Sequence, residues 1–469
     1  MTQIDTSQDV TWQELFAWQY LSKLLVLCLA VWLHAANSML TATLMPVVVQ
    51  DIGGVEFISW AFALYLMGSI VAATSISVFV AKYPFRKVLM AATVIYGLGC
   101  LICGAAPYMT ILLLGRAIQG LGGGALIALV FVSQDRFFPN RFVPRVVAFV
   151  SIVWTLSAFF GPAVGGIFAN YGMWRHAFWL FTGLACLLLV VIPRLLENDL
   201  QQEEFSDGFI PVVRLGFIAA SILLFSAAGV QANTAFSSLL LLVGAGFLIL
   251  FVVRDKQVTQ NRLLPRHAIS LSHPVGLGIS MTFVFCLSIM SFLVYGPVLL
   301  IKLYDLTPLQ AGFVVLLESV GWGLGAVLLS GLPRHVEPKL IKWGGIFLLA
   351  GVVGQAWFLP YGPLWAVIVT ALSSNFGFGM MWGYIIKHVV GYAEKEDKDR
   401  ASGILPSTQQ TGFALGAALT GVIANSFGFE TLTEYQDFQQ VSFWLFAGFI
   451  PIISMGLWLA WRFSRSISH

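Results

Sequence analysis

Two ionisable side chains in this sequence lie deep inside long apolar runs. Glu318 is the one acidic residue near the middle of such a run, in VVLLESVGWGLGAVLLSG, and Arg116 lies inside another, LLLGRAIQGLGGGALI. Ionised groups are costly in an apolar medium, so each position predicts a function or a buried partner. Desolvation favours a neutral carboxyl group, which suits Glu318 to carry a proton, although a neutral glutamate that merely links two helices is the alternative. Arg116 is expected either to fix a helix or to respond to protonation nearby.

Uncharged polar residues in the apolar runs extend this set. His34 and Asn37 are three residues apart, which places them on one face of a helix. Histidine can titrate near neutral pH, but a buried histidine is more often held in a structural hydrogen bond. The candidates for proton coupling are Glu318, Arg116 and His34. The candidates for the lining of a substrate cavity are Asn37, Gln119 and Asn375.

The segment 157–166, SAFFGPAVGG, joins helix-breaking and small residues within one apolar run. In a bilayer, glycine and proline are tolerated because neighbouring helices shield the backbone, and small side chains let two helices approach closely. Gly161, Pro162, Gly165 and Gly166 therefore predict a face on which another helix can slide, although ordinary small-residue packing would use the same residues.

The elements that position these residues are membrane-spanning helices. Of 469 residues, 58% are hydrophobic and 10% are charged, against about 25% charged in an ordinary soluble domain. Fourteen apolar runs are long enough to cross a bilayer. They lie near 22–49, 57–81, 87–106, 108–132, 145–169, 174–193, 210–230, 235–253, 274–301, 308–331, 340–359, 362–386, 401–427 and 440–462. The sequence thus predicts an all-α polytopic membrane protein.

The distribution of basic residues predicts the orientation of these spans. If the N-terminus is cytoplasmic, nearly every Lys and Arg outside the spans falls on the cytoplasmic side, and Arg175 and Lys302 are the exceptions. This asymmetry follows the positive-inside rule, so we expect both termini in the cytoplasm. A gate at the cytoplasmic side is expected to use Asp135, Lys82, Arg86 and Lys87.

A weak internal repeat predicts the division of the chain. Pro46 and Pro297 are each followed by a similar succession of apolar stretch, span, basic loop and span. Repeats of this kind build many transporters. The expected parts are an interfacial or cytoplasmic segment at 1–21, a six-helix bundle at 22–195, a two-helix insertion at 209–254 and a second six-helix bundle at 273–463.

Several motifs resemble the major facilitator superfamily, specifically its fourteen-span branch of drug:proton antiporters of the EmrB/QacA type. GRAIQGLGGG at 115–124 is similar to the family's motif with an intramembrane arginine, and GPAVGG at 161–166 is similar to its antiporter motif. The stretch from Ala401 to Gly412 resembles the segment that opens the family's penultimate helix pair. The resemblance covers nearly the whole chain and implies the major facilitator fold.

The chain departs from that family pattern in two places. Ala81 and Pro84 stand where the loop between the second and third spans usually carries Asp and Gly. Asn37 stands where this branch usually has an acid, nine positions before Pro46. The missing acid favours neutral or anionic cargo over cationic compounds.

The resemblance and the intramembrane ionisable residues together predict a proton-coupled exporter of small amphipathic compounds, of the multidrug-efflux type, working by alternating access. Alternatives are an exporter of a cell-made metabolite such as a siderophore or lipid, and a non-transporting membrane receptor or scaffold. We expect no enzyme activity, cofactor, metal or nucleic acid, because no nucleotide-binding loop or soluble domain is evident. The expected setting is the inner or plasma membrane, as a monomer, joined by periplasmic and outer-membrane export partners if the cell is Gram-negative.

Overall fold

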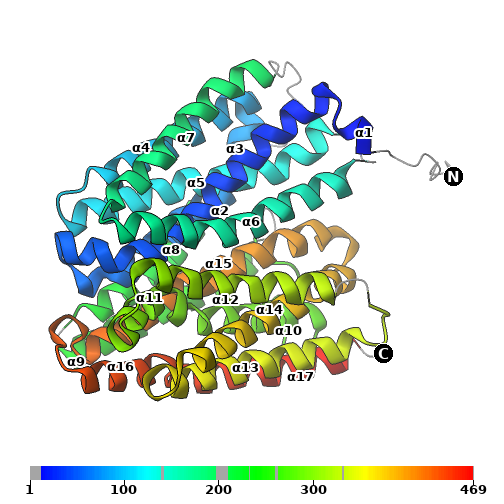
Figure 1. The fold of residues 1–469 in the computed structure, drawn as a ribbon. Helices are drawn as coiled ribbons and strands as arrows, with labels where there is room; N and C mark the ends of the chain where they lie inside the picture. Colours follow the sequence, from blue (N-terminus) through cyan, green and yellow to red (C-terminus); the bar gives the residue numbers. More distant parts are fainter. Residues whose placement is uncertain are drawn as a thin grey trace.

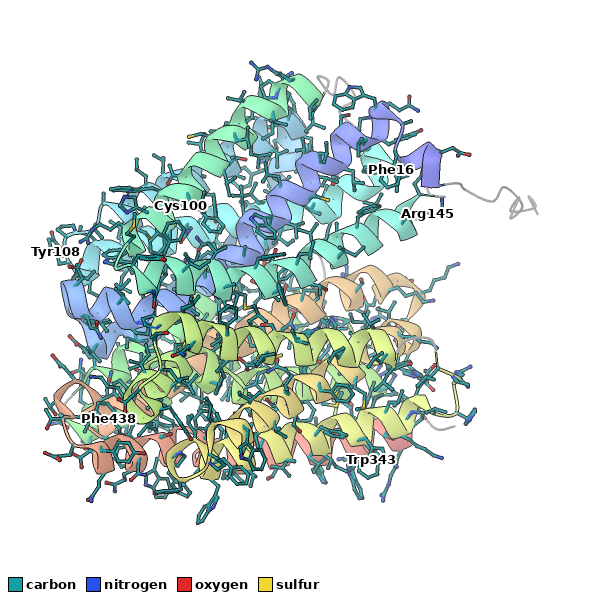
Figure 2. The ribbon with its side chains drawn as sticks, in the orientation of Figure 1. Phe16, Cys100, Tyr108, Arg145, Trp343 and Phe438 are labelled. Carbon is teal, nitrogen blue, oxygen red and sulfur yellow. The ribbon has the colours of Figure 1, made fainter. Side chains whose placement is uncertain are left out.

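The computed structural model describes residues 12–138, 142–196, 210–231, 233–258, 262–329 and 332–467, and every regular element in these residues is helical. The long helices run side by side along one direction, and α1 lies at the same end of the molecule as the end of α17 (Figure 1). We call this the inner end and the opposite one the outer end. Phe16 and Arg145 lie toward the inner end, and Tyr108 and Phe438 lie at the outer end (Figure 2).

The helices form two large groups in chain order, with a hairpin between them. The first group is α1 (Trp12–Leu15), α2 (Trp18–Ile52), η1 (Val55–Phe57), α3 (Ile58–Lys82), α4 (Phe85–Gly104), α5 (Met109–Phe137), α6 (Val143–Asn170) and α7 (Trp174–Leu195). The hairpin is α8 (Val212–Gly229) and α9 (Thr234–Gln257). The second group is α10 (Pro274–Ser288), α11 (Met290–Tyr304), α12 (Pro308–Leu328), α13 (Glu337–Tyr361), α14 (Leu364–Tyr392), η2 (Lys395–Asp397), α15 (Lys398–Ser426), η3 (Phe429–Thr431), α16 (Tyr435–Ala447) and α17 (Ile450–Ser466).

Every predicted span coincides with a helix or with a pair of consecutive helices. Within the described ranges, 13 stretches are long and apolar enough to cross a membrane, and α10–α11 and α16–α17 each count as one of them. The remaining crossing is α15, which is 29 residues long but too polar to be among the 13. It tolerates this polarity because it packs against α3, α8 and α10.

The two groups share one packing pattern. In the first, α5 lies between α3 and α4 and α2 packs on α6, and in the second, α14 lies between α12 and α13 and α10 packs on α15. Glycines bring these helices close together. A Cβ on Gly99 of α4 would overlap the backbone of Gln119 in α5, and one on Gly321 of α12 would lie 2.6 Å from the carbonyl oxygen of Leu372 in α14. The central helices of each group are thereby held in a fixed register.

The groups meet chiefly along two helix pairs, α6 with α12 and α3 with α15, and α2 adds smaller contacts with α11 and α12. The hairpin joins this second contact because α8 packs against both α3 and α15, whereas α9 packs mainly on α8 and leaves most of its surface exposed. Figure 1 shows α8 and α15 where the two groups meet.

Candidate functional site

Arg116 is the centre of a buried polar cluster in the first group of helices. Its side chain is fully buried, and its Nε donates to the carbonyl oxygen of Ala61 on α3 at 3.0 Å. Its Nη1 donates to Oδ1 of Asn37 on α2 at 2.8 Å and to Oε1 of Gln119, one turn further along α5. The structure therefore brings together Arg116, Asn37 and Gln119, and every acceptor of the guanidinium group among the described residues is neutral.

An aromatic layer covers this cluster. The guanidinium carbon of Arg116 lies 4.2 Å from the ring centre of Tyr65, a cation–π distance. The Tyr65 hydroxyl lies 2.9 Å from Nδ1 of His34, and the His34 ring also contacts the ring of Trp154 on α6, with 5.8 Å between centroids. His34 is thus joined to Arg116 through Tyr65, a residue that was not among the candidates predicted from the sequence.

Glu318 and Asn375 form a second buried pair, in the other group. Nδ2 of Asn375 on α14 donates to Oε1 of Glu318 on α12 at 2.7 Å, and both residues are more than nine-tenths buried. The exposed apolar side chains of α12, Phe313, Leu324, Val327 and Leu328, cluster on one side of that helix. At 100° per residue, Glu318 lies about 130° around the helix from the centre of that exposed face. Since Glu318 is also buried, its carboxyl group faces protein.

The small-residue motif on α6 lies where three helices meet. A Cβ added to Gly161 would lie 2.8 Å from the carbonyl oxygen of Ala36 on α2. The absence of a side chain at Gly161 therefore lets α2 pack closely against α6. Pro162 and Gly166 contact α12: a Cβ on Gly312 would lie 2.8 Å from the Pro162 carbonyl oxygen. Gly165 packs on α2 beside Leu40. The motif therefore joins α2 to α12, across the boundary between the two groups.

These contacts belong to the outer half of α6 and the beginning of α12, so they bring the two groups together toward the outer end. A second contact there joins α15 to η1, where Nδ2 of Asn425 donates to the carbonyl oxygen of Glu56 at 2.8 Å. A Cβ on Gly166 would lie 3.1 Å from Cα of Leu309 on α12. The two groups are thus in close contact at the outer end in this conformation.

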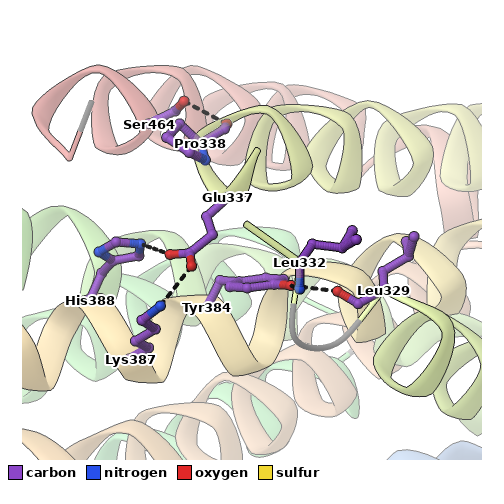
Figure 3. A network of polar contacts seen from close by, with 8 residues as sticks. All are labelled: Leu329, Leu332, Glu337, Pro338, Tyr384, Lys387, His388 and Ser464. Carbon is purple, nitrogen blue, oxygen red and sulfur yellow. Dashed lines mark hydrogen bonds and ion pairs between the residues drawn. The ribbon is translucent and has the colours of Figure 1, made fainter. Parts of the chain in front are cut away.

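At the inner end, a network of polar contacts ties three helices of the second group together (Figure 3). Glu337, the first residue of α13, lies 2.6 Å from Nζ of Lys387 and 2.7 Å from Nε2 of His388, both on the last turns of α14. The Tyr384 hydroxyl donates to the carbonyl of Leu329, at the end of α12. This network fixes the inner ends of α12, α13 and α14 to one another.

A further set of contacts ties the hairpin to the second group. Asp255, fully buried near the end of α9, forms an ion pair with Arg214 of α8 and accepts the backbone N–H groups of Leu263 and Leu264, at 2.9 and 2.8 Å. These leucines belong to the segment that leads to α10. The carboxylate thus fixes that segment to both hairpin helices.

The same segment then contacts the turn before α15. The backbone N–H of Arg266 donates to Asp397 at 2.6 Å, and its guanidinium group pairs with Glu394 at 2.7 Å. Arg400 of α15 pairs with Asp397 at 2.7 Å. Burial alone would raise the pKa of Asp397, but the Arg266 N–H and the Arg400 guanidinium hold that pKa below its usual value. We call Arg214, Asp255, Arg266, Glu394, Asp397 and Arg400 the inner clasp.

The residues predicted for a cytoplasmic gate belong to the inner ends of α3, α4 and α5. Lys82 and Lys87 are exposed in and near the turn between α3 and α4, and Arg86 between them is partly buried. Asp135 falls in α5, but its side chain lies outside the described residues. Among the described residues, no three His, Cys, Asp or Glu side chains are placed to hold a metal ion.

The candidate residues therefore form two sets. Asn37, His34, Arg116 and Gln119 lie in one network, and Glu318 and Asn375 lie in another, with no hydrogen bond between the networks among the described residues. Sequence reasoning missed the inner clasp and the Glu337 network. The one available signal was that Asp255 and Glu337 begin or end apolar runs beside several bases, which also describes many loop residues.

Comparison with known sequences identifies relatives. Residues 27–389 match the sequence profile of the Major Facilitator Superfamily. A probable multidrug-efflux transporter of Mycobacterium tuberculosis is 30% identical over 435 residues, which cover 90% of this chain and 91% of the relative. A multidrug efflux pump of Staphylococcus aureus is 23% identical over 330 residues, which cover 68% of this chain and 70% of the pump.

Solved structures share the fold. A bacterial homologue of the human lysosomal transporter Spinster, in an inward-facing and unoccupied conformation, superposes with a TM-score of 0.67 at 11% identity and covers 96% of this chain and 98% of its own. A D-xylose–proton symporter superposes with a TM-score of 0.62 at 14% identity, and the match covers 92% of this chain and 97% of the symporter. These identities are low, so the likeness establishes the arrangement of helices alone.

Proposed function

Because the chain belongs to the major facilitator superfamily and is therefore a multi-pass membrane transporter, we propose that it exports small amphipathic compounds in exchange for protons. The names of its relatives support efflux as the direction of transport. The proton-coupled step depends on Glu318, and the environment of its carboxyl group is the main support for this proposal.

Glu318 is a buried acid whose hydrogen-bond partner is a neutral amide. Asn375 donates to it at 2.7 Å, and no cation of the described residues pairs with it. Protonation therefore changes the net charge of the interior by one unit, with no counter-charge nearby to offset the change. A group of this kind can alternate between charged and neutral forms as its access to water changes.

Glu318 is also well placed to affect the contact between the two groups. It lies on α12, whose beginning packs against the α6 motif through Gly312 and Pro162. Charging a carboxylate favours exposure to water, and neutralising it favours burial, so the charge of Glu318 biases α12 between two positions against α6. The glycines at this contact let the helices shift without steric conflict between side chains.

The proposed cycle follows from these contacts. Proton binding to Glu318 from the outer side favours closure of the outer end, which is the closed end in this structure. Proton release toward the inner side then permits a compound to bind between the two groups. Asn37, Gln119 and Asn375 line its path in this proposal, with His34 and Arg116 as further coupling residues. Because the compound binds only after Glu318 has released its proton, outward transport of the compound requires inward transport of protons.

The orientation and division of the chain are part of the same proposal. The shared end of α1 and α17 is the cytoplasmic one, because the basic loops gather there. Residues 22–195 and 273–463 are the two moving bodies, 209–254 is the insertion and 1–21 is an interfacial segment. The protein acts as a monomer in the inner or plasma membrane.

Transport in reconstituted vesicles tests this function. The full chain is reconstituted, a pH gradient is imposed, and accumulation of ethidium, dansylamide and dansylate is measured. We expect at least one compound to accumulate against its gradient, and the Glu318→Gln variant to equilibrate it without accumulation. Glu434→Gln, an exposed acid at the outer end, is the matched control. Equal accumulation by wild type and Glu318→Gln would exclude the coupling role.

A further inference from the structure

The cluster around Arg116 contains a positive charge that no described side chain neutralises. The guanidinium group is fully buried, and its hydrogen bonds go to one carbonyl and two amide oxygens. None of the ion pairs among the described residues includes Arg116. A buried cation without a counter-charge is energetically unfavourable, so an anion at this place would be stabilised.

Asn37 adds an unused donor beside this charge. Its Oδ1 accepts from Arg116, which fixes the orientation of the amide, because the reversed amide would place a donor against a donor. Its Nδ2 is completely buried and has no hydrogen-bond partner among the described residues. A buried unpaired donor costs free energy of about 1–3 kcal/mol. An acceptor group at this position would remove that cost.

Gln119 provides another weakly used donor. Its Oε1 accepts from Arg116, and its Nε2 donates to the sulfur of Cys100 at 2.9 Å. A thiol sulfur is a weak acceptor, so this hydrogen bond is easily exchanged for a stronger one. The guanidinium group therefore has an amide donor on either side, at Asn37 and at Gln119.

We propose that Arg116, Asn37 and Gln119 form a subsite for the anionic head group of the transported compound. This inference rests on the proposed transport function and narrows its substrate class to amphipathic monoanions, such as aromatic carboxylates and sulfonates. One positive charge and two neutral donors match a single negative charge with several acceptor oxygens. A dianion would leave one negative charge buried without compensation.

The subsite is closed in the present conformation. His34, one turn before Asn37 on α2, stacks with Tyr65 and contacts Trp154. Trp154 is partly exposed on α6, the helix that carries the small-residue motif. Movement of the His34 and Trp154 rings would open the subsite to a compound held between the two groups, and the apolar part of that compound would remain against the aromatic side chains.

Binding of two matched probes tests the subsite. Dansylate and dansylamide share one ring system, but the first carries a sulfonate and the second a neutral sulfonamide. Equilibrium dialysis with the purified full chain in detergent measures both dissociation constants. We expect the wild type to bind dansylate about tenfold or more tightly than dansylamide, because charged hydrogen bonds are stronger than neutral ones. Equal affinities would overturn the proposal without any variant being needed.

The Asn37→Asp variant sharpens this test because it places a carboxylate in hydrogen-bonding distance of Arg116. The internal ion pair should weaken dansylate binding about tenfold or more and leave dansylamide binding within about twofold. Gln355→Glu is the control, since Gln355 is an equally buried amide on α13. It should keep the preference for dansylate. Equal weakening of both probes by Asn37→Asp, or unchanged binding of both, would contradict the subsite.

These outcomes separate the subsite from the transport proposal. A preference for dansylate that Asn37→Asp removes, in a protein that shows no proton-driven accumulation in vesicles, would support the subsite and refute the transport cycle. Proton-driven accumulation without any preference for the anion would refute the subsite and leave the cycle intact.

Discussion

The inner clasp predicts a local loss of stability when Asp255 loses its charge. Asp255→Asn keeps the size of the side chain but removes the negative charge that faces Arg214. It also replaces a carboxylate that accepts two backbone N–H groups, those of Leu263 and Leu264, by an amide with one acceptor oxygen. We therefore expect the segment between α9 and α10 to open more often, and the turn before α15 to loosen with it through Arg266.

The expected magnitude follows from the burial of the pair. The side chains of Arg214 and Asp255 are 10% and 0% exposed, so solvent screens their interaction only slightly. Removing one partner of a buried ion pair costs about 3–5 kcal/mol. The amide oxygen of the variant still accepts one backbone N–H, so we expect a cost at the lower end of this range, about 3 kcal/mol. At about 1.4 kcal/mol per factor of ten, the backbone amides that Asp255 now holds should exchange about 100-fold faster.

Hydrogen–deuterium exchange with mass spectrometry measures this effect in the peptide that contains Leu263 and Leu264. The control Glu434→Gln should leave that peptide unchanged. The double variant Arg214→Met with Asp255→Asn should recover part of the protection, because it no longer buries a guanidinium group opposite a neutral amide. Exchange within about threefold of wild type in Asp255→Asn, or a double variant less protected than the single one, would refute the energetic role of the clasp.

Two other predictions concern the contact between the groups and the pH range of the clasp. Gly312→Leu should hinder closure of the outer end, because its Cβ alone would lie 2.8 Å from the Pro162 carbonyl oxygen. Labelling of a cysteine introduced at Leu309 should then increase. The control Gly383→Ala should leave this labelling unchanged, because no atom lies within 4 Å of the new Cβ. Protection of the backbone amides in the first turn of α15 from hydrogen exchange should stay constant from pH 8 to pH 5. The pKa of Asp397 is lowered in the folded protein, so the stabilising contribution of its carboxylate is complete above the usual pKa of 3.8 and is lost only at lower pH. A fall in protection between pH 7 and pH 5 would show that another group controls that turn.

Much of the fold was predictable because membrane crossing imposes its own pattern. A span needs about 20 apolar residues, and the runs in this sequence satisfy that length almost everywhere. The one crossing with weak apolar character, α15, was still found because polar residues such as Gln409 and Gln410 are flanked by apolar segments. The family resemblance and the structural likeness agree on the same arrangement.

The pairing of side chains was only partly predictable. Glu318 and Arg116 were identified because charge inside an apolar run is costly and therefore rare, and the partners Asn37 and Asn375 were recognisable as polar residues in spans. The sequence did not indicate which residue meets which, because these contacts join helices far apart in the chain. Tyr65 was overlooked for another reason: an aromatic residue within a span is so common that its type carries no information about its neighbour.

The inner clasp and the Glu337 network were not predictable, for a physical reason. Acids and bases at span ends are normally solvated, and the sequence does not distinguish a solvated carboxylate from a buried one. Asp255 is buried where Leu263 and Leu264 donate their backbone N–H groups to it, and no local sequence pattern predicts that contact.

Proton release on compound binding tests most directly whether Glu318 couples transport to protons. The purified full chain is placed in a lightly buffered detergent solution near neutral pH, a compound that accumulates in the vesicle assay is added, and the change in pH is recorded with an indicator dye. We predict the release of up to one proton per transporter in the wild type and none in Glu318→Gln. An undiminished release in Glu318→Gln, or no release from a wild type that binds the compound, would contradict the proposed cycle.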